Sequence, residues 1–254
     1  MKRLIGIIIF CLGLSATAVA QTEDFGFWYE LGVEKKLSQK WSLGLEGEFR
    51  TRNNSRTADR WSAGVSAEYK IIKGLKASAG YNILIDNNPE ELTWKSSGDP
   101  KKWTPSYWGV RHRFNMGLTG SVGWGRLKVS LRERWQYTHR PEAADKKYAF
   151  TYDSNDYLSG YNLEPIKSKD KHVLRSRLQM EYDIPKWKFD PTASAEMFTD
   201  KNGIQKMRYQ IEVDYKIQKK HVLSLSYRYQ NVNSNDDDND VNSHLVGFGY
   251  KYKF

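Results

Sequence analysis

The sequence predicts an all-β protein, a transmembrane antiparallel β-barrel, and three observations lead to that prediction. Bulky apolar residues alternate with small or polar ones in segment after segment, and most segments have nine residues or more. Tyrosine and tryptophan gather at the segment ends, and the connections between segments alternate between short and long. A tilted strand crosses a bilayer in about 9–11 residues, and aromatic girdles with one set of longer loops are typical of outer-membrane barrels.

The first twenty residues have the parts of a secretory signal peptide. Lys2 and Arg3 are followed by the apolar run "LIGIIIFCLGL" and by the small residues "AVA" at 18–20. We therefore expect residues 1–20 to be removed and residues 21–254 to form a single outer-membrane β-barrel domain. Cys11, the only cysteine, would leave with the signal peptide, so the mature chain would contain no disulfide.

The composition is basic, with a formal net charge of +10 that becomes +8 when Lys2 and Arg3 are removed. Such charge suits nucleic acid or an anionic surface as a partner. Because an exported chain leaves the compartment that holds nucleic acid, we expect no nucleic-acid partner. The positive charge is then expected inside the barrel.

Eleven alternating segments follow the signal peptide. In "FGFWYELGV", for example, the aromatic and aliphatic residues Phe25, Phe27 and Tyr29 share one face. The segments are 25–33, 41–49, 61–69, 75–83, 108–118, 127–137, 173–182, 187–197, 207–215, 223–229 and 244–254. Bacterial barrels have an even number of strands. We therefore expect about 12 strands, with "ELTW" or "KYAFTY" as the twelfth, or 10 if one segment lies outside the wall.

The connections predict which end of the barrel faces which side of the membrane. The short ones are "LSQK", "IKG", "TGSVGWG", "IPK" and "QKK", and the long ones span 53–59, 86–104, 139–170, 200–205 and 231–240. This pattern indicates short periplasmic turns and long extracellular loops. Four aspartates at 236–240 match no calcium-loop spacing, so we expect a solvated loop tip there.

The chain ends in "HLVGFGYKYKF", in which Val246, Phe248, Tyr250, Tyr252 and Phe254 occupy alternate positions. We expect this segment to be the last barrel strand, with its aromatic stripe facing lipid. It resembles the C-terminal signal by which barrel-insertion machinery recognises its substrates. The expected partners are that machinery, outer-membrane lipid and lipopolysaccharide, and the expected state is a monomer in the bacterial outer membrane.

Several stretches together resemble one protein family. They are "EDFGFWYELGVEKKLSQKWSLGLEGEFR", "DRWSAGVSAEYKI", "RHRF", "LRSRLQMEY" and the closing strand. Over nearly the whole mature chain, the sequence resembles the outer-membrane barrel family catalogued as domain of unknown function number 2490. The resemblance implies a barrel fold and an outer-membrane location, and it brings no established activity.

Arginines concentrate on the inward positions of the segments 108–118, 127–137 and 173–182. A hairpin turn over residues 119–126 would align arginines of the first two segments, and pairing Leu127 with Tyr182 would align those of the third. The resulting rows are Arg111–Arg134–Arg175 and Arg113–Arg132–Arg177. Like charges directly opposite one another are destabilising. The carboxylates expected to compensate lie on the early and late segments, at Glu30, Glu34, Glu46, Glu48, Glu68, Glu212 and Asp214.

Two interpretations of such a lumen stay open. Arginines and carboxylates could meet and plug the barrel, which would then be a closed structural barrel. They could instead face one another across water and form a narrow channel for small polar or anionic solutes, with the six arginines as lumen-binding residues. Ten to twelve strands lie between filled eight-strand and open sixteen-strand barrels.

A second candidate site interrupts the apolar stripe on the lipid-facing side. The same hairpin register places His112 opposite Glu133, and the next strand places Ser176 beside Glu133. Serine, histidine and carboxylate together resemble a hydrolase triad. An outer-membrane lipid acyl hydrolase with Ser176 as nucleophile is therefore the alternative function. A structural His112–Glu133 pair is the simpler interpretation, because a catalytic triad needs its histidine between the serine and the carboxylate, whereas here Glu133 lies between Ser176 and His112. We therefore expect that the protein is not an enzyme.

Cofactor and metal motifs are missing from the sequence. The histidines outside the candidate site, His139, His172, His221 and His244, lack the spacing of metal ligands. The glycines fall mostly inside strands rather than in a phosphate-binding loop. We therefore expect neither a cofactor nor a metal.

Overall fold

The computed structural model describes residues 23–185, 187–218, 220–233 and 241–254, and these residues contain fifteen strands. Eleven strands form a closed barrel and four form a separate sheet. Within the described part of the chain, no helix is long and apolar enough to cross a membrane. The expected signal peptide, with Cys11, and the aspartates at 236–240 lie outside the described residues.

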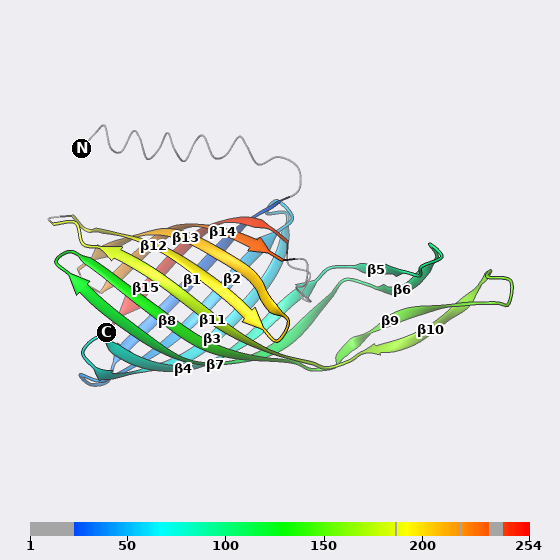
Figure 1. Cartoon of the computed structure of the whole chain (residues 1–254), viewed down its shortest axis with the longest axis horizontal. Helices are drawn as coiled ribbons and strands as arrows, with labels where there is room; N and C mark the ends of the chain where they lie inside the picture. The colour runs from blue at the N-terminus through cyan, green and yellow to red at the C-terminus, as the bar shows by residue number, and fades with distance from the viewer. Residues whose placement is uncertain (1–22, 186, 219, 234–240) are drawn as a thin grey trace, which may run out of the picture.

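The predicted all-β barrel is confirmed, and each alternating segment of the sequence corresponds to one wall strand (Figure 1). The wall strands are β1 (Asp24–Lys36), β2 (Trp41–Arg52), β3 (Thr57–Ile72), β4 (Leu75–Asn88), β7 (Tyr107–Trp124), β8 (Leu127–Arg140), β11 (Lys169–Tyr182), β12 (Phe189–Asp200), β13 (Gly203–Ile217), β14 (His221–Val232) and β15 (Ser243–Lys253). The separate sheet contains β5 (Glu91–Trp94), β6 (Pro100–Thr104), β9 (Ala143–Tyr152) and β10 (Leu158–Ile166).

The described barrel has eleven strands, one more than ten and one fewer than twelve. The two candidates for a twelfth strand do form strands, since "ELTW" is β5 and "KYAFTY" belongs to β9, but both lie outside the wall. Because eleven antiparallel neighbours cannot close with alternating directions, β1 and β15 run the same way. They pair in parallel, beginning with Asp24 opposite Ser243.

The four remaining strands project beyond one end of the barrel, and we call them the arm (Figure 1). β5 and β6 extend the connection between β4 and β7, and β9 and β10 extend the connection between β8 and β11. The two hairpins join where Trp103 of β6 pairs with Tyr148 of β9. The long connections predicted at 86–104 and 139–170 therefore project away from the lumen.

The barrel ends differ in their connections. We call the end that carries the arm the arm end, and the opposite end the turn end. Tight turns close the turn end, where Gly74 (φ 86°) and Gly125 (φ 59°) have the left-handed backbone that glycine adopts at little cost. The sequence predicts long connections at 53–59 and 200–205, both at the arm end. In the structure both are tight turns, because β3 already begins at Thr57 and β13 already begins at Gly203.

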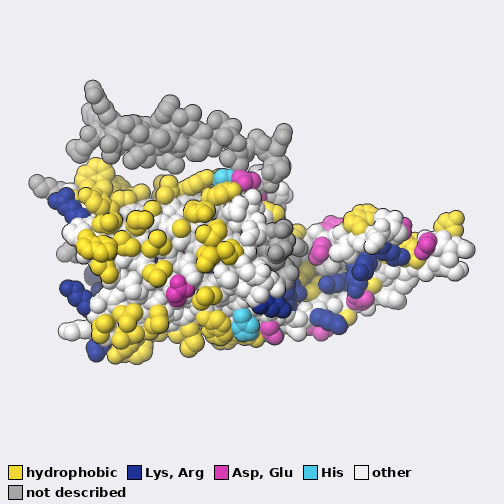
Figure 2. Space-filling model, in the orientation of Figure 1, with side chains coloured by type: hydrophobic (Ala, Val, Ile, Leu, Met, Phe, Trp, Pro, Cys, Tyr) yellow, Lys and Arg dark blue, Asp and Glu magenta, His cyan; other side chains and the backbone are white. Residues whose placement is uncertain are grey.

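Side chains alternate between the outer wall and the lumen, as the pleat of a strand requires. Outward residues such as Leu31 and Met116 are 65% and 60% exposed, whereas the inward residues Trp28 and Leu84 are 5% and 1% exposed. Figure 2 shows the apolar side chains spread over the outer wall. The closing strand follows the same rule, because Phe248 points outward and is 45% exposed. This apolar wall around a polar interior is the arrangement that lipid favours.

Candidate functional site

Inward positions of β8 and β11 carry four arginines in two rows. The two strands pair in the predicted register, so Arg134 lies opposite Arg175 and Arg132 opposite Arg177. The register is strongly specified, because a slip of one residue would turn every arginine toward the outer wall. Since facing like charges repel, this wall needs a compensating carboxylate.

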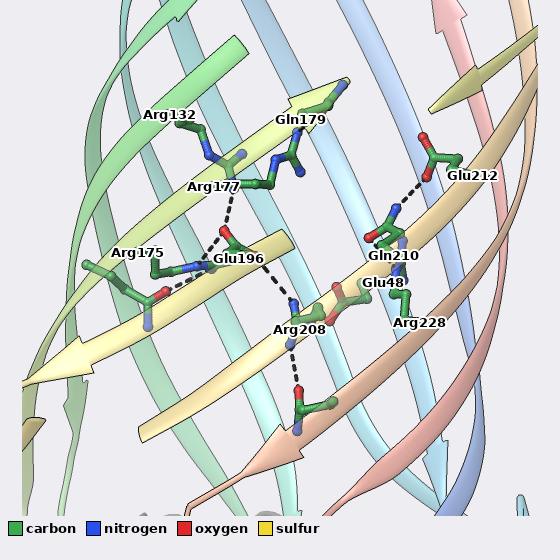
Figure 3. Close-up of polar contacts among 12 residues, drawn as sticks. Glu48, Arg132, Arg175, Arg177, Gln179, Glu196, Arg208, Gln210, Glu212 and Arg228 are labelled. Carbon is green, nitrogen blue, oxygen red and sulfur yellow. Dashed lines mark hydrogen bonds and ion pairs between the residues drawn. The ribbon is translucent and has the colours of Figure 1, made fainter. Parts of the chain in front are cut away.

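Glu196 of β12 provides that carboxylate and is 4% exposed. Its Oε1 lies 2.6 Å from Nη2 of Arg132, and its Oε2 lies 3.0 Å from Nη2 of Arg175 and 3.9 Å from Nη1 of Arg208 (Figure 3). We call these four residues the Glu196 cluster. One negative charge therefore serves three guanidinium groups, and the cluster keeps a net positive charge.

Glu196 is a residue that sequence reasoning misses, because the carboxylates predicted to compensate lie on the early and late segments. The signal for it is present in the sequence. Ala195 and Met197 belong to the outward register of their segment, so the residue between them must point into the lumen. Its position opposite Arg208 depends on the pairing of β12 with β13, which brings a further strand to the arginine wall.

Three inward arginines near this cluster form no ion pair with a described residue. Arg177 donates a hydrogen bond to Gln179, and Arg113 donates one to Oγ1 of Thr138 over 3.4 Å. The Nε groups of Arg134 and Arg177 are buried and have no hydrogen-bond acceptor within the described part of the chain. Guanidinium groups with unused donors are suited to bind carboxylate or phosphate oxygens.

The predicted register between β7 and β8 is wrong, and the rows therefore contain four arginines instead of six. β7 continues to Trp124, and only two residues separate it from β8. Arg113 consequently lies opposite Thr138, whereas the predicted register places it opposite Arg132. The shift of six residues moves the arginines of β7 toward the arm end.

Arg111 moves with this shift and binds a carboxylate instead of facing Arg134. Its Nε lies 3.0 Å from Oδ2 of Asp86, which is 5% exposed. Arg60 of β3 donates to Oδ1 of the same carboxylate. Two arginines share one aspartate here, so this part of the lumen repeats the excess of positive charge found in the Glu196 cluster.

Trp28 of β1 brings arginines together on another part of the lumen wall. Its ring centroid lies 3.4 Å from the guanidinium carbon of Arg50, 4.0 Å from that of Arg228 and 5.1 Å from that of Arg208. Cations are attracted to the face of an indole ring. Arg50 and Arg228 also pair with the predicted carboxylates Glu48 and Glu30, at 2.6 and 2.9 Å. Arg208 belongs to the Glu196 cluster as well, so the Trp28 ring links these ion pairs to the arginine wall.

The lumen encloses a cavity of about 490 Å³ that reaches toward both ends of the barrel. Asp24 and Ser243 line it at the arm end, and Lys251 and Lys253 line it at the turn end. Nine arginines and five lysines line the cavity, against eight carboxylates, which leaves an excess of six positive charges. A small anion would therefore meet a favourable potential along the described lumen.

On the outer wall of the barrel, the hydrolase triad predicted from the sequence is not assembled. Ser176 lies beside Glu133 as expected, and its Oγ donates to Oε2 of Glu133 over 2.6 Å. His112, however, lies opposite His139, six residues along β8 from Glu133 and so roughly 20 Å away. The Nδ1 of His112 contacts the hydroxyl of Tyr81 at 2.7 Å. The predicted His112–Glu133 pair is therefore wrong, and among the described residues no histidine forms a hydrogen bond with Ser176.

Comparisons with solved structures give barrels of similar shape. The beta domain of the Bordetella autotransporter Brka has a TM-score of 0.51 and 13% identity, with 86% of each chain covered. The NanC porin has a TM-score of 0.49 and 12% identity, with 91% of this chain and 99% of the porin covered. At these identities the first match supports the barrel fold alone.

Among curated proteins, the chain matches an NADPH-dependent stearoyl-CoA 9-desaturase of Mycobacterium tuberculosis with 24% identity over 116 residues. The match covers 41% of this chain and 27% of the desaturase, so the chain spans about a quarter of the length of that relative. A family model described as "Protein of unknown function (DUF2490)" matches residues 25–242, which include the Glu196 cluster and every wall strand except β15. The chain therefore belongs to this family of proteins of unknown function.

Proposed function

We propose that the protein is an outer-membrane channel for small anions. The observation that carries this proposal is the excess of six positive charges along the lumen cavity. A cleft lined by one sign of charge between low-dielectric walls raises the local concentration of solutes of the opposite sign. Arg113 and Arg134 line this cavity and would bind such solutes, because neither forms an ion pair with a carboxylate of the described chain. The proposed role is transport, without a catalytic step.

The apolar outer wall supports a position within a bilayer, and the proposal places this bilayer in the outer membrane. The N-terminal residues 1–20 would direct export as a signal peptide. The arm end would face the outside and the turn end the periplasm, because tight turns are found on the periplasmic side of outer-membrane barrels. Barrel-insertion machinery would recognise the strand that precedes Phe254.

A closed structural barrel is the competing function, because ion pairs narrow the lumen. Two observations favour the channel. The same cavity is lined by Asp24 at one end of the barrel and Lys253 at the other. The ion pairs also leave arginines uncompensated, although burying a charge without a partner costs several kcal/mol unless water or an anion reaches it.

Vesicle flux tests the proposal. Folded protein is reconstituted into vesicles that contain a chloride-quenched dye, and valinomycin is added so that potassium can compensate the charge. We expect chloride entry at least tenfold faster than in protein-free vesicles, because the lumen attracts anions. A barrel confirmed as folded by its heat-dependent gel mobility, in vesicles that remain tight to chloride, would instead favour the closed structural barrel.

A further inference from the structure

The arm has one apolar face made of directly paired residues. Residues opposite one another on neighbouring strands share a face, and one row crosses all four arm strands. Leu92 pairs with Trp103, Trp103 with Tyr148, and Tyr148 with Leu163. The Tyr148 ring lies 5.0 Å from the ring of Trp103 and 5.1 Å from that of Tyr161. We call this side of the sheet the aromatic face.

The opposite face of the arm is polar and makes its own ion pair. Lys102 of β6 pairs with Ala149 of β9, and Ala149 pairs with Asn162 of β10. The Nζ of Lys102 lies 2.5 Å from Oε2 of Glu164. This hydrogen bond lowers the pKa of Glu164 below its ordinary value. The polar face is therefore suited to water as it stands.

The aromatic face, in contrast, is uncovered. The side chains of Leu92, Trp94, Leu158, Tyr161 and Leu163 are between 40% and 61% exposed. Within the described residues, the arm strands contact one another and, at their base, β7. A sheet with one apolar face is stable when a second layer covers that face. The described chain supplies no second layer for the arm.

In contrast to the monomer expected from the sequence, we propose that the aromatic face is the contact surface between two copies of this chain. In a membrane, all copies would carry the arm at the same height and pointing the same way. Two aromatic faces could then meet about a two-fold axis normal to the membrane and form a two-layer sandwich. The row from Leu92 to Leu163 contains no charged residue, so the centre of the contact buries no charge. Lys146, which shares the face of Tyr148, and Lys95, which lies over the Tyr152 ring, would stand at the rim of the contact, where their ammonium groups reach water.

The available area is sufficient for a stable pair. Large apolar side chains bury roughly 200 Å² each. At their exposed fractions, the five side chains therefore offer about 550 Å² per copy and about 1,100 Å² for two copies. The partly buried rings of Trp103 and Tyr148 add to this area, which brings it to the lower end of the range of about 1,200–2,000 Å² found for specific interfaces. The two faces can thus supply the area of a small dimer interface.

Cross-linking in intact cells tests this contact, with two neighbouring residues of β10 as a matched pair. Leu163→Cys places a thiol on the aromatic face, and Asn162→Cys places one on the polar face. Both variants also contain Cys11→Ser, which replaces the single cysteine of the sequence. A flexible bismaleimide that reaches about 20 Å is used, because the two-fold axis places the edge strand β10 at opposite edges of the two layers. We expect a linked dimer from Leu163→Cys and monomer from Asn162→Cys. No dimer from Leu163→Cys, or equal dimer from both variants, would overturn the proposal.

Purified full-length protein provides a second measurement by analytical ultracentrifugation in detergent. We expect a dimer whose dissociation constant rises at least 100-fold in the double variant Tyr161→Lys with Leu163→Lys and stays unchanged in Asn162→Lys. Heat-dependent gel mobility checks that each barrel is folded. A monomeric wild-type protein would contradict the two-copy contact. The same holds if that monomer retains lipopolysaccharide bound to the arm. Because the arm lies outside the lumen, chloride flux serves as a separate readout.

Discussion

Glu196 is the residue on which the arginine wall depends most directly. It is the carboxylate nearest to Arg132, Arg175 and Arg208 at once, and it is buried. Removing one partner of a buried ion pair leaves the other charge uncompensated. The balance between stability and anion attraction in the lumen therefore depends on this single side chain.

We predict that Glu196→Gln lowers the free energy of unfolding by about 3 kcal/mol, because three guanidinium groups lose their shared negative charge. The same change should increase the preference for anions. Glu181→Gln is the control, since Glu181 pairs with the half-exposed Lys128 and such a pair contributes about 1 kcal/mol or less. Urea unfolding in lipid vesicles measures both variants, and equal losses would show that Glu196 has no special role.

Pairing of the wall strands shows which elements can be predicted from the sequence. The register of β8 with β11 follows from alternation and from a shared end at Leu127 and Tyr182. The register of β7 with β8 does not, because the glycines of "TGSVGWG" look like a turn. In the structure Gly120 and Gly123 lie within β7, and only Gly125 has a positive φ. Because the glycines inside β7 resemble those of a turn, the turn is predicted too early in the chain. The predicted partners of Arg111, Arg113 and His112 are therefore wrong as well.

The turn before β4 allows a test of this distinction between turn and strand glycines. Gly74 has a φ of 86°, and a Cβ added there would lie 2.7 Å from the carbonyl oxygen of Ser121. We predict that Gly74→Ala destabilises the barrel by about 2 kcal/mol, because strain and a backbone clash add together. Gly120→Ala should be neutral or stabilising, since nothing lies within 4 Å of its added Cβ. Urea unfolding compares the two, and similar costs would contradict the backbone assignment.

At the scale of the whole molecule, alternation predicts the barrel but neither its closure nor its arm. The even-number rule leads to twelve or ten strands, whereas the ring closes with one parallel pair of β1 and β15. "ELTW" and "KYAFTY" have the composition of strands, yet their place in the arm depends on contacts between two distant connections. The alternation of apolar and polar residues within one hairpin does not predict which other hairpin it pairs with.

The parallel pair has a consequence for topology, because β1 must begin at the arm end and finish at the turn end. We predict that an impermeant maleimide labels Glu23→Cys in intact cells. Ser38→Cys, at the other end of β1, should be labelled only after the outer membrane is permeabilised. The reverse pattern would show that the barrel is inserted the other way or is closed differently.

The zero-current potential across a planar bilayer with a potassium chloride gradient tests the anion-channel account most directly. For the wild-type protein we predict a value near the chloride equilibrium potential. The double variant Arg113→Glu with Arg134→Glu, which reverses two charges that line the lumen cavity, should shift it toward the potassium potential. The variant Lys146→Glu with Lys147→Glu, which makes the same change in charge on the arm, should leave it unchanged. A wild-type value near the potassium potential, or no shift with the lumen variant, would contradict the account.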